Sequence, residues 1–195
     1  MSRKGRSAKT HEEILDSAWD MIAEQGADVS MLDIAKAVGI SRQAIYLHFG
    51  TRGGLLMALV KRADERYRIR EDFFEALDTR SPAERLDACL RVWLTFVPKI
   101  LPVAKDLIRL RATDPDASAA WEDRMSDLRS WLRQLAESLY SEGALASSWT
   151  IEEATDYIWT ASSVQVWDLL VVERNWKQDR AATILRESIS KVLLK

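Results

Sequence analysis

The sequence contains few of the residues that build disulfides and metal sites. Among its 195 residues, Cys89 is the only cysteine, and His11 and His48 are the only histidines. One thiol cannot form an internal disulfide, and two histidines with one cysteine do not supply a zinc site of the usual composition. We therefore expect no structural metal and no cofactor.

Glycine is also scarce, and Gly143 is the only glycine after Gly54. The later part of the chain therefore has no glycine-rich loop that would hold a phosphate and no Gly-x-Ser-x-Gly nucleophile elbow. Cys89 has no histidine in its own part of the chain to activate it, because both histidines lie near the N-terminus. We do not expect the protein to be an enzyme.

No apolar stretch approaches the roughly 20 residues that a membrane-spanning helix requires. The basic segment from Ser2 to Lys9 also lacks the apolar stretch of a secretory signal. We therefore expect a cytoplasmic protein that does not contact a membrane.

What the sequence does contain is helical periodicity. Apolar residues recur at helical spacing along most of the chain, and no segment shows the sustained alternation of a strand. This pattern predicts an all-α fold of about nine helices. Capping residues, glycines and prolines place them at residues 10–26, 30–39, from 41 onward, 51–78, 81–98, a short stretch after 102, 115–142, 150–173 and 177–194.

Positive charge is concentrated near the start of the chain. Residues 1–70 contain 12 Lys and Arg against 9 Asp and Glu, whereas residues 71–195 contain 16 against 21. Arg3, Lys4 and Arg6 precede the first expected helix without an acidic neighbour among them. Such a segment is typical of an arm attracted to nucleic-acid phosphates, although a solvated tail has the same composition.

The segment from Met31 to Phe49 meets the steric requirements of a helix-turn-helix unit. Ala35 is small where the two helices cross, and Gly39 permits the left-handed turn between them. Apolar residues at Ile34, Val38, Ile40 and Ile45 are expected to form the buried wedge. At the start of the second helix, the chemistry of the side chains predicts base contacts: Arg42 to guanine, Gln43 to adenine and Ala44 to a thymine methyl group.

The first 60 or so residues resemble the tetracycline-repressor (TetR) family of bacterial regulators. The matching residues are Ile14–Ala18, Glu24–Gly26, Asp33–Ala35, Val38–Ser41, Ile45–Tyr46, His48–Phe49 and Leu55–Leu56. The resemblance implies a helical fold with a DNA-binding head, a body that binds ligand and dimerises, and repression that ligand relieves.

The resemblance also implies phosphate contacts at Ser30, Ser41, Tyr46, His48 and Arg52. Their hydroxyl, imidazole and guanidinium groups can hydrogen-bond phosphate oxygens. Tyr46 would otherwise be a core aromatic residue and His48 a surface histidine. Arg3, Lys4 and Arg6 are expected either to follow the minor groove or to strengthen binding without sequence preference.

Arg52-Gly53 stands where the family usually has Lys-Glu, and a second glycine, Gly54, follows in the first turn of the same helix. Each glycine is expected to weaken the first turn of its helix by about 1 kcal/mol relative to alanine. Since this helix joins the head to the body, the two glycines predict a loose connection.

The body is rich in tryptophan, with seven of the eight tryptophans after residue 90. Bulky aromatic side chains can line a pocket for a planar or lipophilic effector, but they also fill cores and interfaces. The predicted pocket residues are Trp93, Phe96, Trp121, Met125, Trp159 and Trp167.

The expected helix over residues 150–173 is apolar almost all round, which predicts that a second chain covers one of its faces. Together with the last helix, it would form a four-helix interface across a two-fold axis. The predicted interface residues are Ile158, Ala161, Gln165, Leu169, Leu185, Ile189 and Val192.

These patterns predict a DNA-binding domain over residues 1–54 and a ligand-binding and dimerisation domain over residues 55–195. The expected function is that of a homodimeric transcriptional regulator, a repressor that a small lipophilic or aromatic molecule releases from a palindromic operator in double-stranded DNA. The alternative is a helical scaffold or protein-interaction module that does not use its helix-turn-helix on DNA, for instance one that binds a protein partner.

Overall fold

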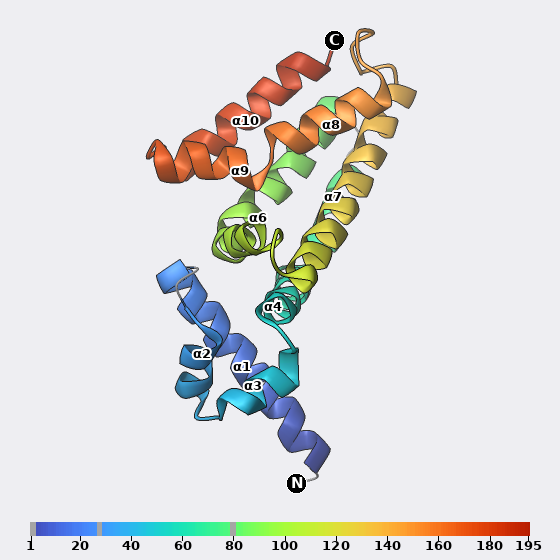
Figure 1. The fold of residues 1–195 in the computed structure, drawn as a ribbon. Coiled ribbons are helices and arrows are strands. Elements are labelled where there is room, and N and C mark those ends of the chain that lie inside the picture. Colours follow the sequence, from blue (N-terminus) through green and yellow to red (C-terminus); the bar gives the residue numbers. More distant parts are fainter. Residues whose placement is uncertain (1–2, 27–28, 79–80) are drawn as a thin grey trace. The chain divides into compact units, whose positions relative to one another are not determined.

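The structure is a computed structural model that describes residues 3–26, 29–78 and 81–195, with side chains described from Thr10 onward. Figure 1 shows that the regular elements of this part of the chain are helices, which confirms the predicted all-α fold. In chain order they are α1 (Arg3–Gln25), α2 (Met31–Val38), α3 (Arg42–Phe49), α4 (Arg52–Tyr67), α5 (Ile69–Leu77), α6 (Pro82–Leu110), α7 (Pro115–Ser141), α8 (Ile151–Ala161), α9 (Val164–Trp167), the π-helix η2 (Asp168–Glu173) and α10 (Gln178–Leu193).

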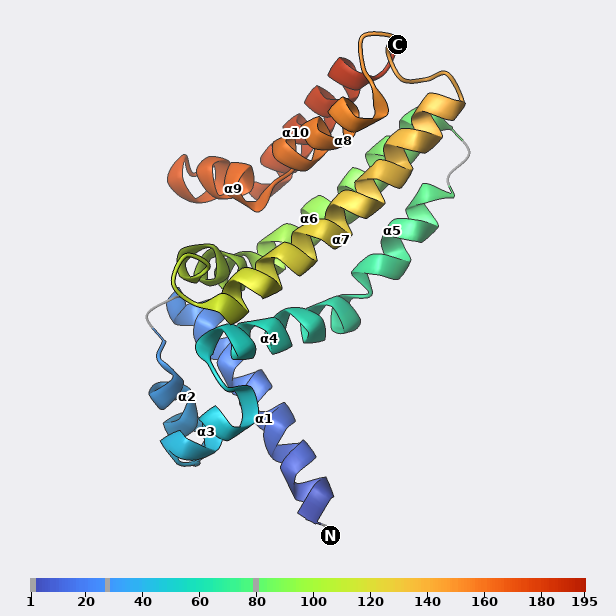
Figure 2. The same ribbon diagram turned by 45° about the vertical axis from the view of Figure 1, so that its right-hand side comes forward.

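The first of two compact units comprises Met1–Arg66 and Pro102–Asp123. It contains α1, α2, α3 and most of α4, together with the end of α6 and the start of α7, which can be followed in Figure 2. Buried apolar side chains from all these helices form its core. Among them are Ile14, Ile22, Ile34, Ile45, Leu55, Leu59, Leu107 and Ala117.

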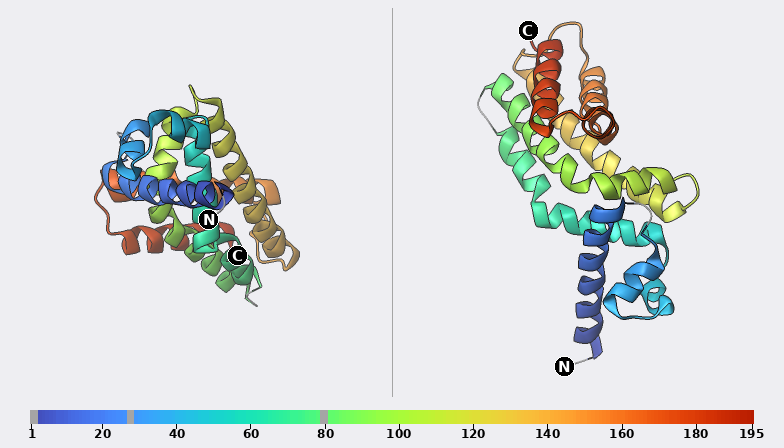
Figure 3. Two further views of the ribbon diagram at one scale, coloured as in Figure 1. Left: turned by 90° about the horizontal axis from the view of Figure 1, so that it is seen from below. Right: turned by 90° about the vertical axis from the view of Figure 1, so that its left-hand side faces the viewer.

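The second unit comprises Tyr67–Leu101 and Arg124–Lys195. Its helix α5 packs on α7, where the rings of Phe73 and Trp131 have centroids 5.7 Å apart. Helices α8 and α10 lie side by side, as Figure 3 shows. The bounds of these two structural units differ from the predicted boundary between a DNA-binding domain and a ligand-binding domain at residue 54. That boundary divides the chain by function and remains a prediction.

Helix α6 corrects the prediction of two helices separated by prolines. It runs without interruption through Pro98 and Pro102. Each proline removes one backbone hydrogen bond, a loss that ends or kinks most helices. Here buried apolar side chains continue on both sides of the prolines, at Val97, Leu101 and Val103. We attribute the continuity of α6 to this burial, which a local stop signal does not reveal.

Two predicted helices are instead broken. The helix predicted over 51–78 is interrupted at Arg68, whose φ of 48° lies in the left-handed region. The helix predicted over 150–173 ends at Ala161, and Ser163 then caps α9 by accepting a hydrogen bond from the Val166 backbone N–H. At the other end of the chain, α1 begins at Arg3, seven residues before the predicted start at Thr10.

Within residues 3–26, 29–78 and 81–195, no helix combines the length and the apolar character that are needed to cross a membrane.

Candidate nucleic-acid interface

Helix α2 begins and ends where the sequence predicts. Ser30 and Asp33 form a reciprocal cap, in which the Asp33 N–H donates to Ser30 Oγ and the Ser30 N–H donates to Asp33 Oδ2, each over 3.2 Å. Hydrogen bonds that the Asp33 carboxylate accepts from the Ser30 hydroxyl and from the Ser30 N–H lower its pKa, the hydroxyl contributing more. Gly39 ends the helix with φ of 74°, as the left-handed turn requires. The Ser30 hydroxyl also donates to Asp33 Oδ2, so it already has an acidic partner.

Helix α3 presents the predicted base-contacting residues at its start. Ser41 caps it by accepting a hydrogen bond of 3.1 Å from the Ala44 N–H. Ile45 and Phe49 are buried against the rest of the unit, whereas Arg42 and Gln43 are exposed and Ala44 is partly exposed. Of the predicted wedge, Ile34 and Ile45 are fully buried, while Val38 and Ile40 are half-buried.

Tyr46 is not a core residue, because 39% of it is exposed. The Arg42 guanidinium lies over its ring, 5.7 Å from the centroid. This contact places both side chains on one side of α3.

His48 is half-buried and lies beside a second histidine. The ring of His11, on α1, is 5.8 Å from His48 and stacks on Phe49 at 4.7 Å, measured between centroids. Burial and then the neighbouring His48 lower the pKa of His11. A phosphate contact at His48 would therefore form next to a histidine that favours its neutral state.

The structure gives Arg52 partners inside the protein, which argues against the predicted phosphate contact. Its Nε donates to Asp106 Oδ2 over 2.7 Å, its Nη2 pairs with the same oxygen, and its Nη1 donates to the Val29 carbonyl. Asp106 is fully buried, and 14% of the Arg52 side chain is exposed. Arg52 therefore joins α4 to α6 and to the segment before α2.

The two glycines after Arg52 allow close packing, which corrects the expectation of a loose connection. The Gly53 N–H donates to Asp114 Oδ2 over 3.1 Å, and Thr51 Oγ1 donates to Asp116 Oδ2 over 2.6 Å. A Cβ on Gly53 would lie 2.6 Å from Asp114 Oδ1 and closer still to the Ala117 nitrogen. A Cβ on Gly54 would overlap the carbonyl oxygen of Phe49. The start of α4 is thus fixed to the residues that cap α7.

Leu47 on α3 is 80% exposed, a feature that no sequence motif indicated. A helical wheel drawn from the positions of Ile45 and Phe49 would have placed it on the outer face. The side chains of Arg3, Lys4 and Arg6 lie outside the described residues, so their predicted contacts remain predictions.

Comparison with known proteins identifies this arrangement. Residues 14–59, which span α1 to α4, match the family "Bacterial regulatory proteins, tetR family". Over this segment the chain is similar to TetR-family regulators. It is 29% identical over 166 residues to the HTH-type transcriptional repressor BepR of Brucella suis biovar 1 (strain 1330), a match that covers 80% of this chain and 78% of BepR.

Two solved structures are similar over nearly the whole TetR-family fold. A TetR-family transcriptional regulator from Agrobacterium tumefaciens has a TM-score of 0.74 at 17% identity and covers 97% of this chain and 100% of its own. SmeT, solved in complex with triclosan, has a TM-score of 0.73 at 16% identity and covers 96% of this chain and 92% of its own. The sequence matches indicate a DNA-binding transcriptional regulator, and the solved structures show that its fold is similar to that of TetR-family regulators.

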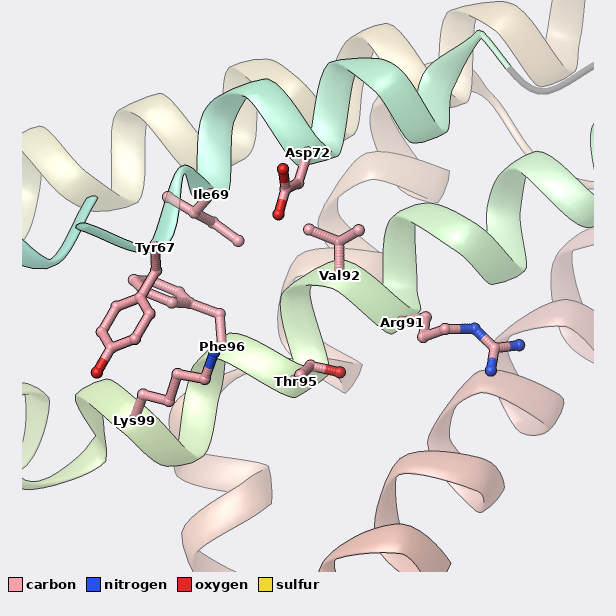
Figure 4. Close-up of a pocket in the computed structure, with 8 residues that line it drawn as sticks. All are labelled: Tyr67, Ile69, Asp72, Arg91, Val92, Thr95, Phe96 and Lys99. Carbon is pink, nitrogen blue, oxygen red and sulfur yellow. The ribbon is translucent and has the colours of Figure 1, made fainter. Parts of the chain in front are cut away.

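In the second unit, one groove lies between α5 and α6 (Figure 4). Its volume is about 230 Å³, and the Lys99 ammonium lies 4.4 Å from the centroid of the Tyr67 ring at one end. Phe96 is the predicted pocket residue that lines it. The lining residues are Tyr67, Ile69, Asp72, Arg91, Val92, Thr95, Phe96 and Lys99.

The other predicted pocket residues are distributed over both units. Trp121 belongs to the first unit, where the Arg111 guanidinium lies 5.9 Å from its ring centroid. In the second unit, Trp93 is buried and its Nε1 donates to the Ser162 carbonyl over 2.8 Å. Met125 and Trp159 are half-buried, and Trp167 is 1% exposed. Within the part of the chain that the structure describes, the buried Trp167 Nε1 has no hydrogen-bond partner.

The predicted dimer face is changed by the break between α8 and α9. Ile158, Leu185 and Ile189 are buried within their own chain, so they are not available to a partner. Ala161 is half-buried, whereas Gln165, Leu169 and Val192 are exposed. Because the helix is interrupted between these two residues, Ile158 and Leu169 do not lie on one face of a single continuous helix. The exposed large apolar side chains near this face are Leu169, Val172, Trp176 and Val192.

Proposed function

We propose that the protein is a homodimeric repressor that binds a palindromic operator through α3 and is released by a small lipophilic or aromatic effector. The observation that carries the DNA-binding part is the outer face of α3, on which Arg42 and Gln43 are exposed next to the capped N-terminus of the helix. The first residues of a recognition helix reach base edges in the major groove. The match to the TetR family over this segment favours DNA over the scaffold alternative.

We assign the base contacts to Arg42, Gln43 and Ala44, and phosphate contacts to Ser41, Tyr46 and His48. The exposure of Tyr46, which is not buried in the core, supports the phosphate assignment. We assign Arg52 instead to the connection between α4 and α6, because its guanidinium is engaged by Asp106. Since operator DNA in bacteria lies in the cytoplasm, this function implies a cytoplasmic protein.

Selection from a random duplex library tests the DNA-binding proposal. The full-length protein should enrich a palindrome, and its affinity should fall steeply as salt rises, because phosphate contacts release counterions. Arg42→Ala or Gln43→Ala should weaken binding by about 1 to 3 kcal/mol and relax the preference at one base pair. Arg180→Ala, which removes an exposed cation from α10, is the matched control and should leave binding unchanged. Failure to enrich any duplex at low salt would refute the proposal.

Dimerisation is supported by three large apolar side chains that are exposed on η2 and in the segment directly after it, Leu169, Val172 and Trp176. Isolated exposed apolar residues are common, but a group of them on neighbouring elements is typical of an interface. Leu169→Asp should convert the dimer to a monomer in sedimentation velocity. Tyr140→Asp, at an exposed apolar position on α7, is the control and should leave the dimer intact. A Leu169→Asp protein that remains a dimer would place the interface elsewhere.

The effector proposal rests on the aromatic residues in the second unit. Trp93 and Phe96 have ring centroids 6.0 Å apart, and the buried N–H of Trp167 offers an unused donor. SmeT, a structural relative, binds a lipophilic aromatic molecule, triclosan. Triclosan is therefore our first probe, followed by a panel of lipophilic compounds. A compound that quenches tryptophan fluorescence should also lower operator affinity; quenching without that loss would show that its site is not the regulatory one.

A further inference from the structure

The outer face of α3 has an apolar centre. A helix turns by about 100° per residue, so Leu47 lies one turn beyond Gln43 and Ala44 on the side away from the buried Ile45 and Phe49. Leu47 is the large apolar side chain with the greatest exposure in the described part of the chain, at 80%.

The charged and aromatic residues of α3 lie beside this centre. Arg42 is held over the ring of Tyr46, and His48 lies next to His11 on the other flank. The side chains that project farthest from the core side of α3 are therefore a carboxamide, a methyl group and an isobutyl group, from Gln43, Ala44 and Leu47. None of the three carries a charge that would favour phosphate.

Major-groove chemistry suggests what these groups contact. The groove displays one apolar group, the C5-methyl of thymine, while a carboxamide pairs well with the N6 and N7 edge of adenine. We infer that Leu47 is a base-reading residue that, with Ala44, receives a thymine methyl group next to the base pair that Gln43 reads. This inference rests on the proposed DNA-binding function and adds a specificity residue to it.

Deoxyuridine tests the inference because it differs from thymidine by the methyl group alone. Each thymine of one operator half-site is replaced in turn, and affinities are measured by fluorescence anisotropy. The wild-type protein should lose about fourfold in affinity at one or two thymines, the factor expected for one buried methylene-sized group. Leu47→Ala should bind the thymine operator more weakly and lose most of that discrimination, while Leu47→Met, which keeps an apolar side chain, should retain it.

Leu32→Ala is the matched control, since Leu32 is a large apolar residue of α2 that is 40% exposed. Its deoxyuridine profile should be that of the wild type. An unchanged profile in Leu47→Ala, or no methyl-sensitive thymine in the wild type, would overturn the role of Leu47 while leaving DNA binding intact. Failure of the wild-type protein to bind any duplex would instead refute the proposed function. Because Leu47 is so exposed, its substitution should not alter the thermal unfolding midpoint, which provides a folding control.

Discussion

Gly53→Ala tests whether the start of α4 is as closely packed as the structure indicates. Gly53 is buried in the first turn of α4. An added Cβ would meet Asp114 Oδ1 at 2.6 Å, the Asp116 carbonyl carbon at 2.9 Å and the Ala117 nitrogen at a shorter distance. Two of these three atoms belong to backbone, which cannot rotate away as a flexible side chain can.

Two effects of opposite sign determine the result. Alanine is a better helix former than glycine by about 1 kcal/mol, which alone would stabilise the variant. Forcing a methyl group into a packed site typically costs about 1 to 3 kcal/mol. The hydrogen bond from the Gly53 N–H to Asp114 would also be lost, at about 1 kcal/mol. We therefore expect a net loss of about 1 to 3 kcal/mol in the free energy of unfolding.

Urea denaturation of the wild type and the variant, at the same protein concentration, measures this difference. Ala119→Gly, at an exposed position on α7, is the control for helix propensity and should cost about 1 kcal/mol. A Gly53→Ala protein that is more stable than the wild type by about 1 kcal/mol would refute the reasoning. That result would mean that α4 and the start of α7 are not in contact in solution.

Three further predictions follow from the first unit. Asp106→Ala should lower the free energy of unfolding by about 3 to 5 kcal/mol, because it leaves the Arg52 charge without its buried partner. Asp16→Ala, which breaks an exposed ion pair, is the control and should cost less than about 1 kcal/mol. Equal losses of the two variants in urea denaturation would contradict this prediction. Ser41→Ala should cost about 1 kcal/mol through loss of the α3 cap, and an unchanged midpoint would argue against the cap. Because folding lowers the pKa of His11, the unfolded chain binds its proton more readily, so stability should fall as the pH drops through the ordinary value of 6.5. His11→Phe, which keeps the stacking on Phe49, should reduce that pH dependence, and an identical pH profile would contradict it.

The helix-turn-helix was predictable from the sequence because local interactions determine it. Ser30, Gly39 and Ser41 each act within a few residues of their own position, through a capping side chain or a left-handed turn. Such signals are complete in the sequence, and the structure places both ends of α2 and the start of α3 at these residues. The exposure of Arg42 and Gln43 follows from the same short helix.

The connection between α4 and its neighbours was not predictable in this way. The sequence suggested that Gly53 loosens a helix and that Arg52 contacts phosphate. The structure argues against both interpretations, because Asp106 and Asp114, more than 50 residues later, accept hydrogen bonds from the Arg52 guanidinium and the Gly53 N–H. Helix propensity describes a residue among its chain neighbours, and it carries no information about a distant carboxylate.

The same distinction explains the errors in the body. Pro98 and Pro102 are local stop signals that burial of α6 overrides, and the break at Ser162 accompanies a hydrogen bond from the distant Trp93. The sequence alone therefore determined the helical class and the DNA-binding motif, because caps, turns and periodicity are local. Only the tertiary structure decided where long helices continue or break and which side chains remain exposed, because those outcomes depend on residues that are distant in the chain.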